Sequence, residues 1–463
     1  MPELENIKPR PHLLIVSNDV VDTKMAGPGM RYLELARVLS QDLNVTLAIP
    51  SETTLQVPNI KLVRYWDERP KSLQVLVENS DITLVSGYMV EKFPFLHQTQ
   101  KRIVVDLYDP FILENLHYHL NKPLPAQESL NNRAVDVTNN LARLGDFFIC
   151  GSDRQRDFWI GLLASNGRIN PRNFAKDTSL RSLIDVVGIG FLNREPRPNP
   201  TLRGIHPGFP EDARIVLWGG GIWDWLDPLT LVKAWTGVIA EYPQARLVFL
   251  GTRHPNPQVP PHKMAQQVQV LAAEIGEKDR TIFFYEWIPY EQREALLCEA
   301  DIGVTLHPPH IETRYSIRTR VLDYLWARLP VLVSEGDVTS EWVKEYGVGK
   351  AVPPLDVEAV RVAIAQILER PKSSWASAFE PLRDSLNWSQ VVEPLRRYCL
   401  QPEYAPDRQI RKLVTPTVVK RGKLARVIEI WRTEGSRELL KRIKLKFRRR
   451  LSNSKFKIQN SKM

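Results

Sequence analysis

Short apolar runs alternate with longer polar or amphipathic stretches along most of the chain. In the first 190 residues, six of these runs have the length of strands and are bounded by turn-forming residues. They lie at residues 12–17, 45–49, 82–85, 103–105, 147–149 and 183–187. Because most of these runs are apolar throughout, we expect parallel strands that are buried on both faces. Strands that alternate with helical segments predict βαβ units and a doubly wound α/β domain.

The same pattern restarts after a proline-rich passage. Its prolines are typical of an extended linker: Pro196, Pro198, Pro200, Pro207 and Pro210. Beyond it, strands are expected at residues 215–218, 247–250, 282–284, 302–306 and 331–333. The sequence therefore predicts two Rossmann-like domains, with parallel sheets, that face each other across a cleft. We expect the first domain at residues 1–190, the linker at 191–212, the second domain at 213–400 and a helical tail at 401–463.

Composition agrees with a soluble two-domain protein. The 463 residues exceed what one hydrophobic core usually supports, and 43% hydrophobic and 25% charged residues are ordinary values. The three cysteines have no metal-ligand spacing, which favours reduced thiols in the cytoplasm. No apolar run approaches the roughly 20 residues that span a bilayer. Secretion and membrane insertion are therefore not expected.

The net charge of +10 comes from the end of the chain. Residues 408–463 contain 19 Lys or Arg and 3 acids, whereas residues 1–407 contain 44 basic and 50 acidic residues. Leu424, Val427, Ile428 and Trp431 recur with the helical period, and cations fill the other faces. Such a helix suits the surface of an anionic membrane, and the alternative is a solvated end. Nucleic acid is not expected as a partner, because stacking aromatics and known modules are missing. We expect a cytoplasmic protein, peripheral on the inner face of the membrane.

The segment at residues 310–330 concentrates charge at a strand-to-helix turn, where open α/β sheets bind ligands. A helix is expected to begin near Ser316, and its free N–H groups and dipole attract anions. Three arginines surround this start: Arg314, Arg318 and Arg320. The pattern predicts a phosphate or pyrophosphate site, with Asp323 suited to sugar or ribose hydroxyls. The alternative is that the arginines only pair with Glu312 and Asp323 on a solvated helix.

Other strand ends should converge on the same cleft. Gly27, Gly29 and Arg31 follow the first strand, where glycine lets a backbone approach a ligand, although glycine also marks ordinary loops. Asp106 and Asp109 follow the fourth strand and suit either the cleft or structural hydrogen bonds.

In the second domain, a loop with three consecutive glycines, at residues 219–221, follows the first strand. Such glycines are expected where a ligand or another backbone comes close. Asp227 is expected to cap the next helix, which begins at Pro228. Trp223 and Trp225 flank Asp224 and suit either stacking on a base or sugar or a domain interface.

Three segments carry a family resemblance: residues 27–31, residues 219–229 and residues 322–331. They resemble GT-B glycosyltransferases of the broad group around the retaining family 4 nucleotide-sugar enzymes, and the general pattern extends over residues 10–400. By this resemblance Asp323 replaces a glutamate that binds the nucleotide ribose. Tyr315 stands where the family has its other glutamate, and Glu312 is a nearby substitute. The family's Arg and Lys in the glycine loop are absent here, where Asp224 and Asp227 stand.

The resemblance implies transfer of a sugar from a nucleotide donor to a glycan or lipid-linked acceptor, with retention, in cell-surface polysaccharide synthesis. Fixed cations and N–H groups would stabilise the leaving diphosphate. No Asp-x-Asp triplet is present and His307 and His310 lack zinc-ligand spacing, so neither a metal nor a cofactor is expected. Asp109 is the catalytic candidate, orienting the sugar or acceptor.

The expected acceptor side of the cleft comprises Gly27, Gly29 and Arg31. The expected donor side comprises Gly220, Gly221, Asp224, Arg253, Glu312, Ser316, Arg318, Arg320 and Asp323. Two alternatives remain: an epimerase-like enzyme that acts on nucleotide sugars, and a degenerate binding protein without activity.

Overall fold

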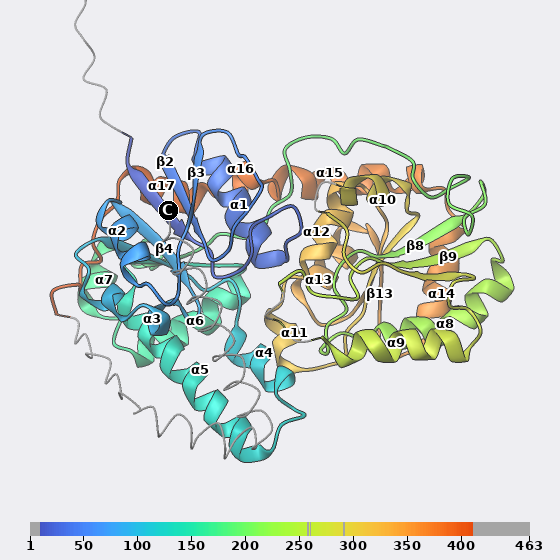
Figure 1. Cartoon of the computed structure of the whole chain (residues 1–463), viewed down its shortest axis with the longest axis horizontal. Coiled ribbons are helices and arrows are strands. Elements are labelled where there is room, and N and C mark those ends of the chain that lie inside the picture. Colours follow the sequence, from blue (N-terminus) through green and yellow to red (C-terminus); the bar gives the residue numbers. More distant parts are fainter. Residues whose placement is uncertain (1–9, 257–258, 260, 290–291, 411–463) are drawn as a thin grey trace, which may run out of the picture.

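Two parallel sheets form the centres of two α/β domains (Figure 1). The structure, a computed structural model, describes residues 10–410 except 257–258, 260 and 290–291. The amphipathic tail helix predicted from the sequence lies outside these residues. In the described part of the chain, no helix has both the length and the apolar character needed to cross a membrane.

The first sheet has seven strands in the order β3-β2-β1-β4-β5-β6-β7, and every pairing is parallel. Its strands are β1 (His12–Val16), β2 (Asn44–Ile49), β3 (Ile60–Arg64), β4 (Ile82–Ser86), β5 (Arg102–Asp106), β6 (Phe147–Cys150) and β7 (Ile184–Val186). The second sheet has six parallel strands in the order β10-β9-β8-β11-β12-β13. Its strands are β8 (Arg214–Trp218), β9 (Ala245–Phe249), β10 (Ile282–Phe284), β11 (Ile302–Thr305), β12 (Val331–Ser334) and β13 (Gly349–Val352). The predicted fold class is confirmed.

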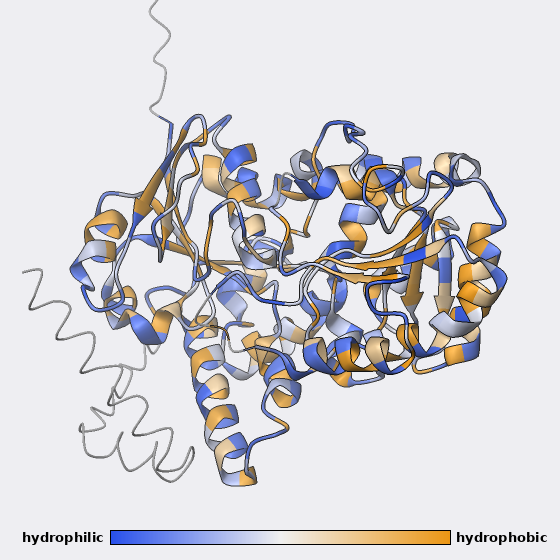
Figure 2. Ribbon diagram, turned by 45° about the vertical axis from the view of Figure 1, so that its right-hand side comes forward, coloured by the Kyte–Doolittle hydropathy of each residue, from blue (hydrophilic) through white to orange (hydrophobic). Residues whose placement is uncertain are grey.

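Helices cover both faces of the first sheet, as its apolar strands require. They are α1 (Gly27–Leu39), α2 (Lys71–Glu78), α3 (Met89–Lys92), α4 (Phe111–Tyr118), α5 (Leu124–Leu144), α6 (Asp153–Ser165) and α7 (Pro171–Lys176), with a 3₁₀ turn η1 (Pro94–Gln98). One core cluster joins the sheet to α2, α3, α5 and α6, and a second joins the opposite face to α1. Figure 2 shows orange, hydrophobic strands inside and blue, hydrophilic positions on the outer helix faces.

The second domain has one core cluster that extends over its sheet and the helices around it. These are α8 (Pro228–Glu241), α9 (Lys263–Glu274), α10 (Arg293–Glu299), α11 (Ile311–Tyr315), α12 (Thr319–Trp326), α13 (Val338–Tyr346), α14 (Val357–Leu368), η3 (Lys372–Trp375) and α15 (Ala376–Ser385). Asp227 caps α8 as expected, because its Oδ1 accepts a hydrogen bond from the Thr230 N–H at 3.1 Å.

The end of the described chain returns to the first domain. Helices α16 (Trp388–Val391) and α17 (Glu393–Leu400) pack on the first sheet beside α1, through Trp388, Leu395 and Cys399. The sequence assigned residues up to 400 to the second domain, whereas the structure places the last two helices in the core of the first. The spacing of their apolar residues predicts helices, but it does not determine which of the two sheets these helices cover.

Candidate functional site

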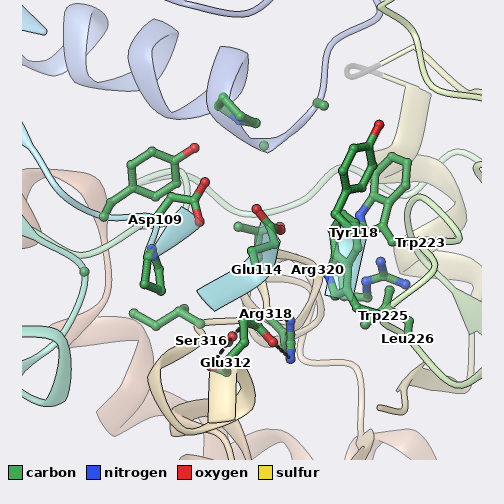
Figure 3. A pocket seen from close by; sticks show the side chains of 18 of the residues that line it. Asp109, Glu114, Tyr118, Trp223, Trp225, Leu226, Glu312, Ser316, Arg318 and Arg320 are labelled. Atoms are coloured by element: carbon green, nitrogen blue, oxygen red, sulfur yellow. Dashed lines mark hydrogen bonds and ion pairs between the residues drawn. The ribbon is translucent and has the colours of Figure 1, made fainter. Parts of the chain in front are cut away.

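A cavity of about 400 Å³ lies between the two domains, at the carboxyl ends of their strands. Parallel α/β sheets bind ligands at this edge, so the position agrees with the sequence prediction. Six residues predicted for the site line the cavity: Gly27, Asp109, Glu312, Ser316, Arg318 and Arg320. Figure 3 shows the last five of these together with Glu114, Tyr118, Trp223 and Trp225.

The helix expected to begin near Ser316 is two helices. Helix α11 ends at Tyr315, the backbone of Ser316 is extended, and α12 begins at Thr319 with Arg318 as its N-cap residue. The Ser316 hydroxyl donates to the carbonyl of Glu312 at 3.0 Å and also to its carboxylate, which ends α11. The Val321 N–H donates to the Arg318 carbonyl at 2.8 Å, so the N–H groups left to attract an anion are those of Thr319 and Arg320, beyond the predicted start.

Glu312 and Arg318 form a buried, two-point ion pair. Arg318 Nη1 and Nη2 donate to the two carboxylate oxygens of Glu312 at 3.1 and 3.0 Å, and its Nε lies 3.6 Å from Asp337. Burial alone would lower the pKa of Arg318, but these two carboxylates outweigh it and the pKa is raised. The charge of Arg318 is therefore held by protein groups, which agrees with the alternative interpretation of these arginines.

Arg320 is the contrasting case. Its side chain is 7% exposed, its Nη2 donates to the Gly221 carbonyl at 2.7 Å, and its Nη1 has no partner among the described residues. No carboxylate of the described chain lies within ion-pair distance of this guanidinium, which stands 4.8 Å over the Trp218 ring. Burial lowers its pKa to about 10, and the charge of Arg318 acts in the same direction. Arg320 is thus a buried cation that faces the cavity without a counter-ion.

The triple-glycine loop is explained by close packing. A Cβ at Gly219 would lie 2.8 Å from the Tyr324 ring, and one at Gly221 would lie 2.1 Å from Trp223. A Cβ at Gly251 would lie 2.8 Å from the Cα of Gly221. Gly220 and Gly221 do not line the cavity. Both glycines instead contact Arg320, which lines the cavity. Arg320 donates to the Gly221 carbonyl and lies 3.6 Å from a Cβ built at Gly220.

Two carboxyl groups enter the cavity from the first domain. Asp109 follows β5 and Glu114 lies on α4, and neither side chain has a hydrogen bond or ion pair within the described residues. Burial raises the pKa of Asp109 to about 7, and the nearby charges of Glu312 and Asp106 add to this. Burial and the Asp109 and Glu312 carboxylates also raise the pKa of Glu114 well above its ordinary value, against the effect of Arg318. Both carboxyl groups that face the cavity therefore hold their protons more tightly than an exposed carboxyl group does.

Aromatic rings form another wall of the cavity. Trp223 stacks beside Trp225 at 6.0 Å and packs against His262 at 4.8 Å, both measured between ring centroids. Tyr118, from the first domain, meets Trp225 edge to face at 6.4 Å. Both tryptophans line the cavity, and Trp225 also contacts the opposite domain.

Arg31 and Gly29 lie beneath the cavity wall and do not line it. Arg31 is fully buried, donates to both oxygens of Asp106 at 2.7 and 3.1 Å, and donates to the carbonyls of Val187 and Gly188. A Cβ at Gly29 would lie 2.2 Å from the Val20 carbonyl. Both residues hold α1 against the sheet, which gives each a structural role beside the one expected at the acceptor side.

Three further residues predicted for the donor side do not line the cavity. Asp224 accepts a hydrogen bond from the Met264 N–H at 2.9 Å, and Arg253 is exposed at the surface. Asp323 accepts a hydrogen bond from Arg293 Nη1 at 2.9 Å, so its carboxylate already has a partner. The ribose contact inferred for Asp323 stays a prediction, because this hydrogen bond uses only one of its carboxylate oxygens.

Sequence reasoning missed several cavity residues. They are Glu114, Asn115, Tyr118, Gln155 and His262. Gln155 joins the domains, because its side-chain amide donates to the carbonyls of Tyr108 and Tyr315, each at 2.8 Å. Position after a strand identifies His254, but the residues on α4 follow no strand directly. In the described part of the chain, no group of three or more His, Cys, Asp or Glu is placed to hold a metal ion.

Known structures share this architecture, although no family model and no curated protein sequence matches the chain. Sucrose-phosphate synthase from Thermosynechococcus elongatus is 16% identical with a TM-score of 0.58, over 84% of this chain and 98% of the other. HepE from Anabaena in complex with UDP and glucose is 11% identical with a TM-score of 0.59, over the same shares.

WaaG, a glycosyltransferase involved in lipopolysaccharide biosynthesis, is 14% identical with a TM-score of 0.56, over 84% of this chain and all of the other. Each of these likenesses extends over both domains. The chain has the two-domain GT-B fold, as the sequence predicted.

Proposed function

We propose that the protein is a glycosyltransferase that takes a sugar from a nucleotide-sugar donor. The observation that carries this proposal is Arg320, a buried guanidinium that faces the interdomain cavity without a counter-ion in the described chain. Leaving a buried cation unpaired is costly, so an anion is expected beside it when the site is occupied. A diphosphate fits, because the backbone N–H groups at the start of α12 lie next to Arg320.

The proposed reaction breaks the bond between the sugar C1 and the diphosphate oxygen and forms a bond from C1 to an acceptor hydroxyl oxygen. The leaving oxygen gains negative charge, which Arg320 and the α12 N–H groups stabilise. The acceptor proton passes to the leaving phosphate if the configuration is retained, as the family resemblance implies. Arg318 contributes indirectly, because its ion pair with Glu312 fixes the segment that leads into α12.

UDP-glucose is the first donor to test. Solved structures of HepE are described as complexes with UDP, UDP-glucose, and UDP with glucose, and a trehalose-6-phosphate protein from E. coli is described as bound with UDP-2-fluoro glucose. These likenesses concern the fold, so the choice of donor for this chain is part of the proposal. We place Asp109 beside the transferred sugar or the acceptor, since its carboxyl faces the cavity without a partner in the described residues.

Replacement of Arg320 tests the proposal. We expect Arg320→Ala to weaken UDP binding about 10–100-fold, the equivalent of losing hydrogen bonds to a charged group. Isothermal titration measures this, and Arg253→Ala is the matched control because Arg253 is exposed outside the cavity. UDP-glucose hydrolysis then tests turnover. Equal UDP affinity in Arg320→Ala and wild type would overturn the diphosphate assignment, and binding without turnover would support a degenerate protein.

We also propose that the basic tail brings the cavity to a glycan or lipid-linked acceptor at an anionic membrane, as in polysaccharide synthesis. The support is the charge of the sequence, with 19 basic and 3 acidic residues in residues 408–463. The full chain should sediment with vesicles that contain anionic lipid, and a chain truncated after residue 410 should not. Equal sedimentation of both would contradict this role, while UDP binding should be the same in both.

A further inference from the structure

The cavity has one end with a cation and another with two titratable carboxyl groups. Arg320 provides the cationic end, 7% exposed and unpartnered at Nη1 in the described chain. The carboxyl groups of Asp109 and Glu114 provide the other end, and neither has a hydrogen-bond or ion-pair partner among the described residues. Arg318 is already occupied by Glu312 and Asp337, so it does not neutralise this pair. A diphosphate at Arg320 therefore leaves two acidic groups of the same cavity without a cation.

Aromatic rings stand beside the acidic end. Tyr118 lies one helical turn after Glu114, so both side chains are on the same face of α4 and line the cavity. Trp225 meets Tyr118 edge to face at 6.4 Å from the opposite domain. Figure 3 shows Glu114 between Asp109 and the rings of Tyr118 and Trp225. Carboxylates combined with aromatic faces are the usual surroundings of a bound ammonium group.

We infer that this end of the cavity binds an ammonium group of the acceptor, so that the acceptor is an amine-bearing sugar. The inference rests on the proposed glycosyltransferase function and specifies its acceptor. With a neutral sugar, burial keeps the Asp109 and Glu114 carboxyl groups protonated to a large extent, whereas a bound ammonium group attracts their ionised forms and so lowers the pKa of both. The acceptor hydroxyl next to the amine then lies between the two carboxyl groups and the diphosphate, beside the bond between sugar and diphosphate that breaks in the transfer.

Binding of matched sugars tests the inference whichever donor the protein uses. D-glucosamine differs from D-glucose only at C2, where an amine replaces a hydroxyl. The affinities of both sugars for the full chain are measured by ligand-detected NMR at pH 7, with and without UDP. We expect glucosamine to bind about ten-fold more tightly or better, as for other hydrogen bonds to charged groups. N-acetylglucosamine, which has the same skeleton without the charge, should bind like glucose.

Two variants locate the effect. Glu114→Gln and Asp109→Asn should each reduce the preference for glucosamine at least several-fold, whereas Glu128→Gln, an exposed change on α5, should leave it intact. Equal affinity for the two sugars in the wild type would overturn the inference, and so would a preference that persists in both cavity variants. UDP affinity is measured on the same samples. Failure to bind UDP or any other nucleoside diphosphate would overturn the proposed function, whereas intact binding of a nucleoside diphosphate without amine preference would overturn only the acceptor assignment.

Discussion

Arg318 and Arg320 stand two residues apart and have different roles. Arg318 points to Glu312 and Asp337, whereas Arg320 reaches the glycine loop and keeps one nitrogen without a partner in the described chain. The sequence predicted that cations gather here, because the arginines follow a strand end. It did not indicate which of them pairs with an acid, since that depends on the break between α11 and α12 and on Asp337, which lies 19 residues after Arg318. Charge placement was thus predictable, and charge pairing was not.

Asp109 should make stability depend on pH. Its pKa of about 7, raised from 3.8 by burial and by Glu312 and Asp106, means that the folded chain binds this proton more tightly than the unfolded chain. Its contribution to stability is complete below about pH 4 and is lost as the pH rises through 7. Asp109→Asn stays neutral, so we expect it to raise Tm by about 2–4 °C more at pH 8 than at pH 5. Glu114 and Arg318 also face this group, so Glu114→Gln is measured in parallel.

Thermal unfolding at both pH values checks this expectation. The same change in Tm at pH 5 and pH 8 would mean that the Asp109 carboxyl does not titrate between them in the folded protein.

At the level of elements, every central strand was predictable, whereas two of the four edge strands were not. All eleven predicted runs correspond to strands, because a strand buried on both faces needs a continuous apolar run. The two missed strands, β3 and β13, lie at sheet edges and carry Lys61 and Lys350 within them. Edge strands have a neighbour on one side only, and charged residues there limit unwanted pairing. Helix α4 was missed as part of the site, because the prediction considered only residues that directly follow a strand at its carboxyl end.

The glycine loop after β8 gives a prediction at this scale. We expect Gly221→Ala to destabilise the protein by about 1–3 kcal/mol, because the new Cβ would overlap the Trp223 ring at 2.1 Å. Gly161→Ala on α6 is the control. Its Cβ would meet nothing within 4 Å, and alanine favours a helix by about 0.5–1 kcal/mol over glycine. Chemical denaturation measures both, and a neutral effect of Gly221→Ala would show that the Trp223 ring moves aside without cost.

At the scale of the whole molecule, the returning end of the chain couples the two domains. After α15 on the second domain, the chain crosses to the first, where α16 and α17 complete the core and Tyr398 stacks on Phe147 at 4.6 Å. The linker at the other crossing, residues 191–212, is rich in proline and contains little regular secondary structure. Two covalent crossings, with Gln155 bridging Tyr108 and Tyr315 between them, limit how far the domains can separate, and therefore how the cavity opens.

The anchor of this returning segment is a buried ion pair between Arg168 and Asp407. Arg168 donates to both carboxylate oxygens of Asp407 at 2.7 and 3.1 Å, and both side chains are 2% exposed. Removal of one partner leaves a buried charge uncompensated, so we expect Asp407→Ala to destabilise the protein by about 3–5 kcal/mol. Glu403, four residues earlier, pairs with Lys176 at the surface, and Glu403→Ala should cost no more than about 1 kcal/mol.

Denaturant unfolding followed by the near-UV signal compares the two variants. Because Asp407 holds the segment to the first domain, its loss should also increase amide hydrogen exchange in α16 and α17, while exchange in β8 to β13 stays unchanged. Equal destabilisation by both variants, or unchanged exchange in α16 and α17, would mean that the apolar packing of Trp388 and Leu395 holds the segment without the ion pair.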